Sequence, residues 1–244
     1  MLREHRFNKE TKMKEHFAIA IDGPSGAGKS SLARRLAEEF SLIYVDTGAI
    51  YRTLALAAIR AGVDRKDEAS LMELLPKLEI TMAYNDSGEQ RMYLDGEDVS
   101  ELIRTPEVSV GASDVSAHGR VREYLLEMQR RMARENDVIM DGRDIGTVVL
   151  PDAGLKIFLT ASSEARAERR LKELLAKGMD VSFDEVLQDI EYRDRQDSGR
   201  EAAPLKKADD AILVDTSDID FQASFELLRS IVADKLYNDE GRRK

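Results

Sequence analysis

Cysteine is absent from this chain of 244 residues. The protein can therefore form neither a disulfide bond nor a thiolate metal site, and the absence fits a reducing compartment such as the cytosol. A chain of this length buries enough surface to fold without a disulfide or a structural metal. We therefore expect a cytoplasmic protein whose stability comes from its core.

A long apolar run is also missing. Residues 1–16 are charged throughout, and the apolar segment that follows, 17–21, is far too short for a signal peptide or a membrane-spanning helix. We predict no membrane association. We expect residues 1–15 to form a disordered tail, with an added helical turn as an equal alternative, and residues 238–244 to form a second tail.

The chain lacks positive net charge. It has 37 Lys and Arg against 47 Asp and Glu, which gives a formal charge of −10 and an isoelectric point of about 5.0. Proteins that bind nucleic-acid backbones usually present a basic face, so the charge argues against a nucleic-acid partner. A small anionic ligand needs positive charge only in one cleft, and such a ligand stays compatible with this composition.

Strand and helix patterns alternate along most of the chain, without an internal repeat or a low-complexity linker. Short apolar runs of the kind buried on both faces of a parallel sheet occur at 17–21, 42–45, 138–140, 155–159 and 211–214. Helical spacing of apolar residues occurs at 31–40, 51–60, 106–134, 163–177, 183–195 and 221–237. This alternation predicts an α/β fold, a three-layer α/β/α domain with a parallel sheet, over residues 16–237.

The periodicity changes between residues 67 and 105. Apolar and polar residues alternate over 78–82 and again over 92–94, with an Asn-Asp-Ser-Gly turn at 85–88 between them. Period two around such a turn is typical of an antiparallel hairpin. We therefore predict a small antiparallel β lobe, about 67–105, inserted into the parallel domain.

A glycine-rich segment joins the first predicted strand to the first helix. Glycines let backbone N–H groups surround phosphate oxygens, and the helix N-terminus adds partial positive charge. The full motif between a strand and a helix argues against a turn without a ligand. The segment matches G-x-x-x-x-G-K-[ST] at every position and is called here the phosphate-binding loop: Gly23, Pro24, Ser25, Gly26, Ala27, Gly28, Lys29 and Ser30.

This loop predicts ATP as the ligand and Mg²⁺ as the cofactor. Lys29 would reach the bridge between the β- and γ-phosphates, and a hydroxyl from Ser30 or Ser31 would hold the metal. An Asn-Lys-x-Asp guanine-reading segment is missing from the later part of the chain, which argues against a GTPase. Phosphoryl transfer also requires an acceptor, which needs a second anion site near the loop.

The segment 46–52 follows the second predicted strand directly and should lie beside the phosphate-binding loop. Arg52, on the helix that follows, could clamp an acceptor phosphate with two parallel hydrogen bonds. An alternative with equal weight is a helix cap formed by Asp46 or Thr47, with Arg52 in solvent.

The segment 141–144 follows the apolar strand 138–140. Asp141 stands where a carboxylate would meet Mg²⁺ through water, and Asp144 could accept hydrogen bonds from a base amine. Arg143 between these carboxylates points to a ligand site, whereas the alternative is a polar turn with a local ion pair.

Two predicted helices near the C-terminal end are rich in arginine. Most helical arginines are solvated and paired with nearby acids, but a phosphoryl-transfer site needs positive groups that close over the reaction. Arg193, Asp197 and Arg200 would share one side of the helix if it continues past 195. We predict a short arginine-rich helical lid, about 172–202. The third group of candidate residues, not all of them functional, is Arg166, Arg169, Arg170, Arg193, Arg195 and Arg200.

Together these motifs resemble the bacterial cytidylate kinase family, which phosphorylates CMP and dCMP and is a branch of the nucleoside monophosphate kinases. The resemblance covers residues 16–237, and the segment 141–149 and the inserted lobe are its specific parts. It is carried by 23–29, 46–52, 94–100, 103–108, 141–149, 156–162 and 203–205.

The resemblance implies a role for individual residues. It implies that Lys29, Arg143 and Arg193 are catalytic residues and that the protein is a monomer, as most members of the family are. On the ATP side it implies the phosphate-binding loop with Ser31 and Arg166. On the acceptor side it implies Arg52, Arg143, Ser25 and Thr47 near the phosphate, Ser113, Arg122 and Asp144 at the cytosine, Arg193 and Asp197 at the ribose, and Arg200 at phosphate. Ser30 or Ser31, with Asp141, would hold Mg²⁺.

Two alternatives remain at this point. One is a related kinase whose acceptor is UMP, AMP or shikimate. The other is a regulatory module that binds a nucleotide without turnover, although such a sensor has no need for so many acceptor-side residues.

Overall fold

The computed structural model describes residues 16–242. The predicted N-terminal tail, 1–15, and residues 243–244 lie outside the described residues. Helix α8 (Phe221–Arg242) continues through 238–242, which the sequence analysis had assigned to a C-terminal tail. Within the described residues, no helix has both the length and the apolar composition needed to cross a bilayer.

A five-stranded sheet forms the centre of the molecule, in the order β2-β6-β1-β7-β8. All of its neighbouring strands run parallel, as the uninterrupted apolar runs predicted. The α/β fold class is confirmed. The strands are β1 (Ala18–Asp22), β2 (Ile43–Asp46), β6 (Val138–Gly142), β7 (Leu155–Thr160) and β8 (Ile212–Asp215).

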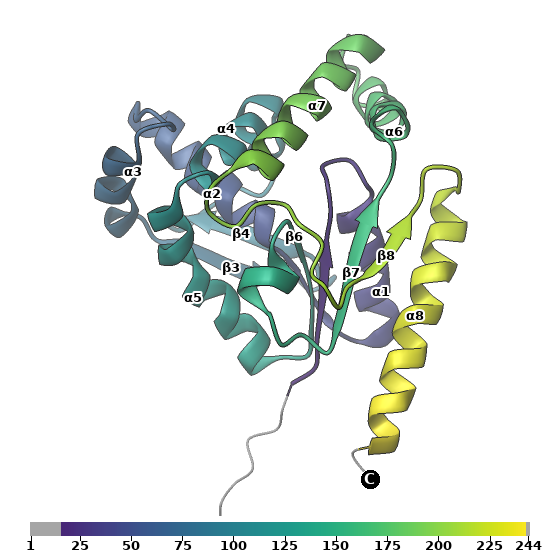
Figure 1. Ribbon diagram of the computed structural model, residues 1–244. Helices are drawn as coiled ribbons and strands as arrows, with labels where there is room; N and C mark the ends of the chain where they lie inside the picture. Colours follow the sequence, from purple (N-terminus) through teal and green to yellow (C-terminus); the bar gives the residue numbers. More distant parts are fainter. Residues whose placement is uncertain (1–15, 243–244) are drawn as a thin grey trace, which may run out of the picture.

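Helices cover both faces of this sheet, because alternate strand residues point to opposite sides. Ile19 and Ile21 pack with α1 (Lys29–Phe40) and α8 on one face. Ala20 packs on the other face, in the cluster that includes residues of α5 (Gly119–Glu135). Figure 1 shows α5 and α8 on opposite sides of the sheet, with α6 and α7 above the carboxyl ends of its strands.

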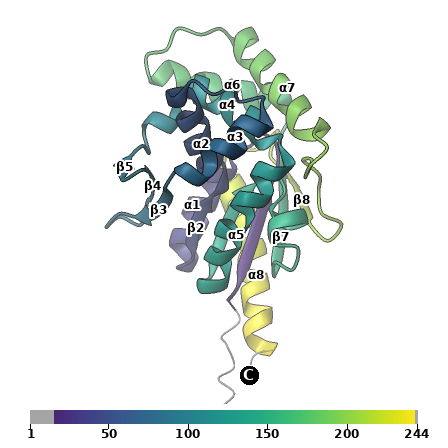
Figure 2. The ribbon, with the colours of Figure 1, turned by 90° about the vertical axis from the view of Figure 1, so that its left-hand side faces the viewer.

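The inserted segment forms a separate antiparallel sheet in the order β3-β4-β5, which confirms the predicted hairpin. Figure 2 shows it at one side of the molecule, next to α2 and β2. The Tyr84 hydroxyl donates to the Tyr44 carbonyl of edge strand β2 at 2.8 Å. The segment contains α3 (Glu68–Leu74), β3 (Ile80–Tyr84), β4 (Gln90–Leu94), β5 (Glu97–Asp98) and the short 3-10 helices Leu75–Lys77 and Leu102–Arg104.

Three helical regions differ from the sequence pattern. Helix α2 (Thr47–Ala61) begins before the predicted start at residue 51. The predicted helical stretch 106–134 is divided into α4 (Pro106–Ser116) and α5. A five-residue π-helix, Ile145–Val149, follows β6 and was not predicted; we call it the π-turn.

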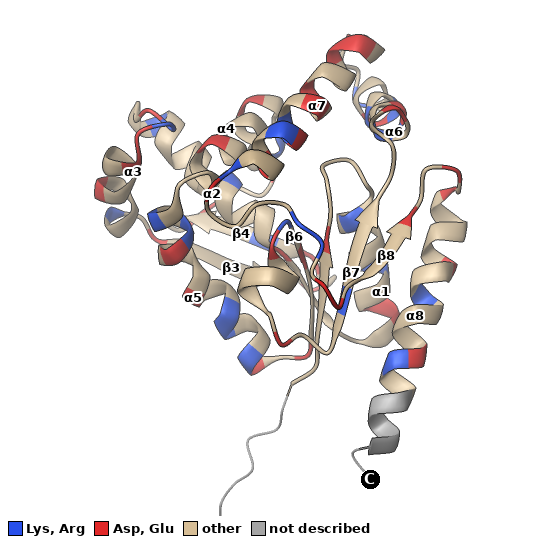
Figure 3. Cartoon of the chain, viewed as in Figure 1, with Lys and Arg blue, Asp and Glu red and all other residues tan. Residues whose placement is uncertain are grey.

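Helices α6 (Ser163–Ala176) and α7 (Phe183–Gly199) pack on each other through their own small apolar cluster. Helix α7 extends to Gly199, four residues beyond its predicted end at residue 195, so the condition for Arg193 and Asp197 to share a helix is met. Both signs of charge are interspersed along α5 and α7 (Figure 3). Arg193 and Asp197 thereby lie on one helix, which ends beside Arg200.

Candidate active site

A cleft of about 780 Å³ lies at the carboxyl ends of β1, β2 and β6. It runs from the phosphate-binding loop to α4 and α7, as expected for a parallel α/β sheet. Twelve of its lining residues are Lys or Arg and eight are Asp or Glu, so the cleft is positive although the chain is negative. Every residue predicted to bind ATP, acceptor or metal lines it except Gly23, Pro24 and Arg166.

The phosphate-binding loop has the backbone shape that its glycines predict. A Cβ on Gly23 would stand 1.9 Å from the carbonyl oxygen of Leu159, and Gly28 has a φ of 87°. Only glycine adopts such positions without strain. Gly28 is also the N-cap of α1, which has no side-chain cap and no acid in its first turn. The N–H groups at this helix end are therefore available to an anion.

Lys29 is buried at the base of the loop, and its ammonium group donates to the Pro24 carbonyl at 2.7 Å. Burial, together with repulsion from Arg143, lowers the pKa of Lys29 to about 7. The charged amine therefore lacks sufficient compensation from the protein alone. An anionic ligand in the cleft would provide that compensation.

Ser30 and Asp141 lie in direct contact at one side of the loop. The Ser30 hydroxyl donates to Asp141 Oδ2 at 2.8 Å, and the Tyr44 hydroxyl donates to Oδ1 at 2.9 Å. Ser31 is exposed on the surface of α1. Burial and the nearby charge of Asp46 raise the pKa of Asp141 to about 6, which a bound cation would reverse.

These groups fit the way in which proteins hold Mg²⁺. No group of three or more His, Asp or Glu side chains among the described residues has a geometry suited to a metal ion. Magnesium is usually bound through one or two protein oxygens together with substrate phosphates and water. The Ser30 and Asp141 pair beside an anion site matches that requirement.

Asp46 is the N-cap of α2 and the ion-pair partner of Arg52, so the predicted helix cap is confirmed while Arg52 is paired rather than free in solvent. The contact of Arg52 with an acceptor phosphate stays a prediction. Its carboxylate accepts the Ala49 N–H at 3.0 Å and an Arg52 N–H at 2.7 Å. Partial burial alone would raise the pKa of Asp46, but Arg52 lowers it below the usual value. From the inserted lobe, the Gln90 amide bonds to both backbone groups of Asp46, at 2.8 and 3.2 Å. Arg52 is therefore held at the cleft edge.

Helix α7 brings Asp197 against the segment that follows β6. Arg143 Nε donates to Asp197 Oδ2 at 2.6 Å, and Arg200 lies 3.8 Å from the other carboxylate oxygen. Burial alone would raise the pKa of Asp197, but Arg143 and Arg200 lower it below its usual value. Arg193 is attracted by Asp197 as well, but burial, with repulsion from Arg143, lowers the pKa of Arg193 to about 10.

Three cleft arginines carry nitrogens that point to an anionic ligand. Arg52 Nε, Arg193 Nε and Arg200 Nη2 are buried, and none of them has a hydrogen-bond partner among the described residues. Buried donors without partners are rare in folded proteins and destabilise them. Since all three arginines line the cleft, they are candidates for contact with an anionic ligand.

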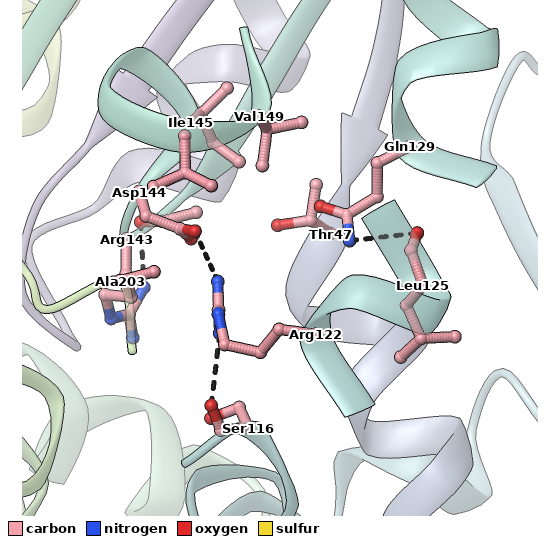
Figure 4. A network of polar contacts seen from close by, with 12 residues as sticks. Thr47, Ser116, Arg122, Leu125, Gln129, Arg143, Asp144, Ile145, Val149 and Ala203 are labelled. Carbon is pink, nitrogen blue, oxygen red and sulfur yellow. Dashed lines mark hydrogen bonds and ion pairs between the residues drawn. The ribbon is translucent and has the colours of Figure 1, made fainter. Parts of the chain in front are cut away.

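A buried ion pair lies at the far end of the cleft (Figure 4). Arg122 from α5 donates to the Asp144 carboxylate, and its other nitrogen donates to the Ser116 carbonyl at 3.2 Å. Its guanidinium also stacks over the Tyr51 ring, 5.2 Å from the centroid. Ser113 lines the cleft one helical turn before Ser116. The group holds charged donors and an acceptor carboxylate in fixed positions, as recognition of a base edge requires.

Two predicted residues are occupied by the protein itself. The Thr47 hydroxyl donates to the Asp141 carbonyl at 2.8 Å. Arg166 is buried and makes a two-bond pair with Asp194 of α7, at 2.6 and 3.1 Å, and donates to the Ser25 carbonyl at 3.0 Å. Arg166 therefore lies under the phosphate-binding loop, outside the cleft, and its direct contact with ATP stays a prediction.

Sequence analysis missed several residues that shape the site. Asp22, Tyr44, Gln90 and Asp194 contact predicted residues or the backbone beside them. Arg169 was named in the arginine-rich group, but its contact was not predicted: it holds the loop after β8 through the Thr216 carbonyl. Only Asp22 carried a usable signal, because an acid at the end of an apolar strand, directly before a glycine loop, is costly to bury.

Comparisons with known proteins agree with this geometry. A family model described as Cytidylate kinase matches residues 19–233. A cytidylate kinase of Geobacter sulfurreducens is 50% identical over 217 residues, which cover 89% of this chain and 93% of the relative. One of Syntrophotalea carbinolica is 48% identical over 223 residues, covering 91% and 94%, and one of Carboxydothermus hydrogenoformans is 49% identical over 217 residues, covering 89% and 97%. The chain therefore belongs to the cytidylate kinase family.

Proposed function

We propose that this protein transfers the γ-phosphoryl group of ATP to CMP or dCMP, giving ADP and CDP or dCDP. The observation that carries the proposal is one positive cleft with the phosphate-binding loop at one end and the Arg122–Asp144 pair at the other. A donor triphosphate and an acceptor monophosphate can then lie in line between them. The family membership of the chain supports the same reaction.

The chemistry follows from charge and position. The attacking atom is a phosphate oxygen that already carries negative charge, so no strong general base is required. Lys29 and the N–H groups at the start of α1 hold the donor phosphates, and Arg143 and Arg193 neutralise the charge that develops on the transferred group. The orphaned nitrogens of Arg193 and Arg200 suit this role.

On the acceptor side, Arg52 and Arg143 bind the phosphate of CMP, with Ser25 and Thr47 nearby. Arg193 and Asp197 contact the sugar, and Ser113, Arg122 and Asp144 read the cytosine. Arg143 and Asp197 now contact each other at 2.6 Å, so each must share its hydrogen bonds when the acceptor binds.

A bound magnesium ion would supply positive charge to neutralise the phosphate oxygens of the donor. We propose Ser30, rather than Ser31, as the residue that binds it, with Asp141 acting through water, because only Ser30 contacts Asp141.

Two segments of the chain are proposed to move during the reaction. We propose that the inserted lobe, about 67–105, carries the acceptor and that the arginine-rich segment of about 172–202 closes over ATP as a lid, within one domain of residues 16–237. We further propose a cytoplasmic monomer that acts on small nucleotides and has no nucleic-acid or membrane partner.

A steady-state panel tests this function. With ATP and Mg²⁺, turnover should be fastest with CMP and dCMP and much slower with UMP, AMP or shikimate. Equal or higher activity with one of these three would replace cytidylate as the acceptor. Calorimetry that showed ATP binding without CMP binding or turnover would instead favour a nucleotide sensor.

Replacement of each of the two serines by alanine tests which of them binds the metal. For Ser30→Ala we expect the Mg²⁺ concentration at half-maximal activity to rise by about tenfold or more, because a ligating oxygen is lost. Ser31→Ala is the matched control, since Ser31 is exposed, and should stay within about twofold of the wild type. Titration of activity with Mg²⁺ at saturating nucleotide measures both, and a larger effect in Ser31→Ala would reverse the assignment.

A further inference from the structure

The π-turn comes directly after two residues that the proposed function places on the acceptor, Arg143 and Asp144. Its backbone hydrogen bonds join residues five apart in the chain. The Val149 N–H donates to the Asp144 carbonyl at 3.1 Å, and the Leu150 N–H donates to the Ile145 carbonyl at 2.7 Å. Single π-turns are rare and often occur at functional sites. The direction in which Arg143 and Asp144 point depends on how this turn is held.

Asp22 holds the first N–H groups of the turn. Its Oδ1 accepts the Ile145 N–H at 2.8 Å, and its Oδ2 accepts the Gly146 N–H at 2.7 Å. Asp22 is only 4% exposed. At Gly146 a Cβ would stand 3.3 Å from Asp22 Oδ2 and 3.1 Å from Lys156 Cδ, so the backbone approaches the carboxylate where a side chain has little room.

Arg130 of α5 holds the other end of the turn. Its Nη2 donates to the Val148 carbonyl at 2.8 Å, and its Nε donates to the Val149 carbonyl at 3.0 Å. An acid therefore binds the first donors of the turn and a base binds its last acceptors. Figure 4 shows Ile145 and Val149, at the two ends of the turn, beside Asp144 and Arg143.

Asp22 also connects the two halves of the cleft. It is the last residue of β1, directly before Gly23 of the phosphate-binding loop, and it pairs in register with Gly142 of β6. Burial raises its pKa to about 6 in spite of the two backbone bonds. Retaining a carboxylate in so unfavourable a place requires a compensating role.

We propose that Asp22, assisted by Arg130, is a positioning residue that fixes Arg143 and Asp144 toward the acceptor nucleotide and keeps them in register with the phosphate-binding loop. Asp22 does not line the cleft and acts through the π-turn. The inference rests on the proposed function and names residues that decide its acceptor specificity.

The variant Asp22→Asn tests the proposal, because the asparagine has one acceptor oxygen and its amide would face an N–H group. We expect the KM for CMP to rise about tenfold and the ratio of kcat/KM for CMP over UMP to fall about fivefold. The KM for ATP should stay within about twofold. A loss of folded protein lowers all rates together, so a purely structural role would leave the CMP/UMP ratio unchanged.

Two further variants complete the experiment. Asp152→Asn is the matched control, since Asp152 is exposed in the loop that follows the turn, and its kinetic constants should equal those of the wild type. Arg130→Met removes the other anchor from a half-buried position and should shift the CMP/UMP ratio in the same direction. It decides the question if Asp22→Asn does not fold.

The outcomes separate the two proposals. Wild-type protein without CMP-dependent turnover would refute the proposed function. A normal wild type, with an unchanged KM for CMP and an unchanged CMP/UMP ratio in the folded variants, would overturn the positioning role alone.

Discussion

Lys29→Met should lower kcat for CMP phosphorylation by about 10³-fold. The variant loses the positive charge of a buried ammonium group that the fold holds in place for the transferred phosphate. Methionine keeps most of the volume of the lysine stem, so the core beneath the loop stays filled. The buried ammonium donates to the Pro24 carbonyl at 2.7 Å, and that bond is replaced by a thioether contact. Single-turnover and steady-state rates measure the effect.

The same variant should be more stable than the wild type, although it is less active. The lowered pKa of Lys29 shows that its charged form is disfavoured in the folded protein, so Lys29→Met should raise the free energy of unfolding without nucleotide. Lys66→Met, at an exposed position, is the matched control and should change neither quantity. A kcat for Lys29→Met within about tenfold of the wild type would contradict the role of this charge.

Asp144→Asn should lower kcat/KM for CMP by about 100-fold while leaving the KM for ATP within about twofold. The cytosine loses a charged hydrogen-bond acceptor on the protein. Asp144 and Ser116 also hold Arg122 in place, so the variant leaves Arg122 as a buried cation without its carboxylate. Breaking such a pair also lowers the free energy of unfolding, by about 3 kcal/mol. Coupled assays with CMP and UMP, and urea unfolding, measure the two effects.

A variant at another, partly buried carboxylate distinguishes an effect on base recognition from an effect on stability. Asp114 is partly buried near Arg65, with 3.7 Å between their charged atoms, and it does not line the cleft. Asp114→Asn should therefore lower stability without changing the preference for CMP. An unchanged ratio of kcat/KM for CMP over UMP in Asp144→Asn would refute Asp144 as a reader of the base.

The candidate site could be predicted from sequence wherever one short segment carries a complete chemical function. The phosphate-binding loop is such a segment, because its glycines, lysine and serine act through the backbone of a single turn. The partner of Arg166 was out of reach, since Asp194 lies on another helix and nothing in the local sequence of Arg166 specifies it. Gln90, which contacts Asp46 across a chain separation of 44 residues, was missed for the same reason.

The fold shows the same division. Apolar runs predicted the five parallel strands, and period two predicted the hairpin of the inserted lobe, because burial on two faces or on one face is written in the spacing of side chains. The π-turn was not predicted, since its wide hydrogen bonds leave no period in the sequence. The early start of α2 depends on whether Asp46 caps the helix, and that depends on Arg52 and Gln90 in space.

The sequence by itself determined the parallel core, the anion site at the start of α1 and the kind of ligand that this site holds. These properties follow from local patterns: apolar spacing, left-handed glycines and the helix end. Only the tertiary structure decided which polar groups meet: Ser30 and not Ser31 with Asp141, Arg143 with Asp197, and Asp22 with the N–H groups of the π-turn. Those contacts join segments far apart in the chain, and their geometry is set by packing and not by sequence spacing.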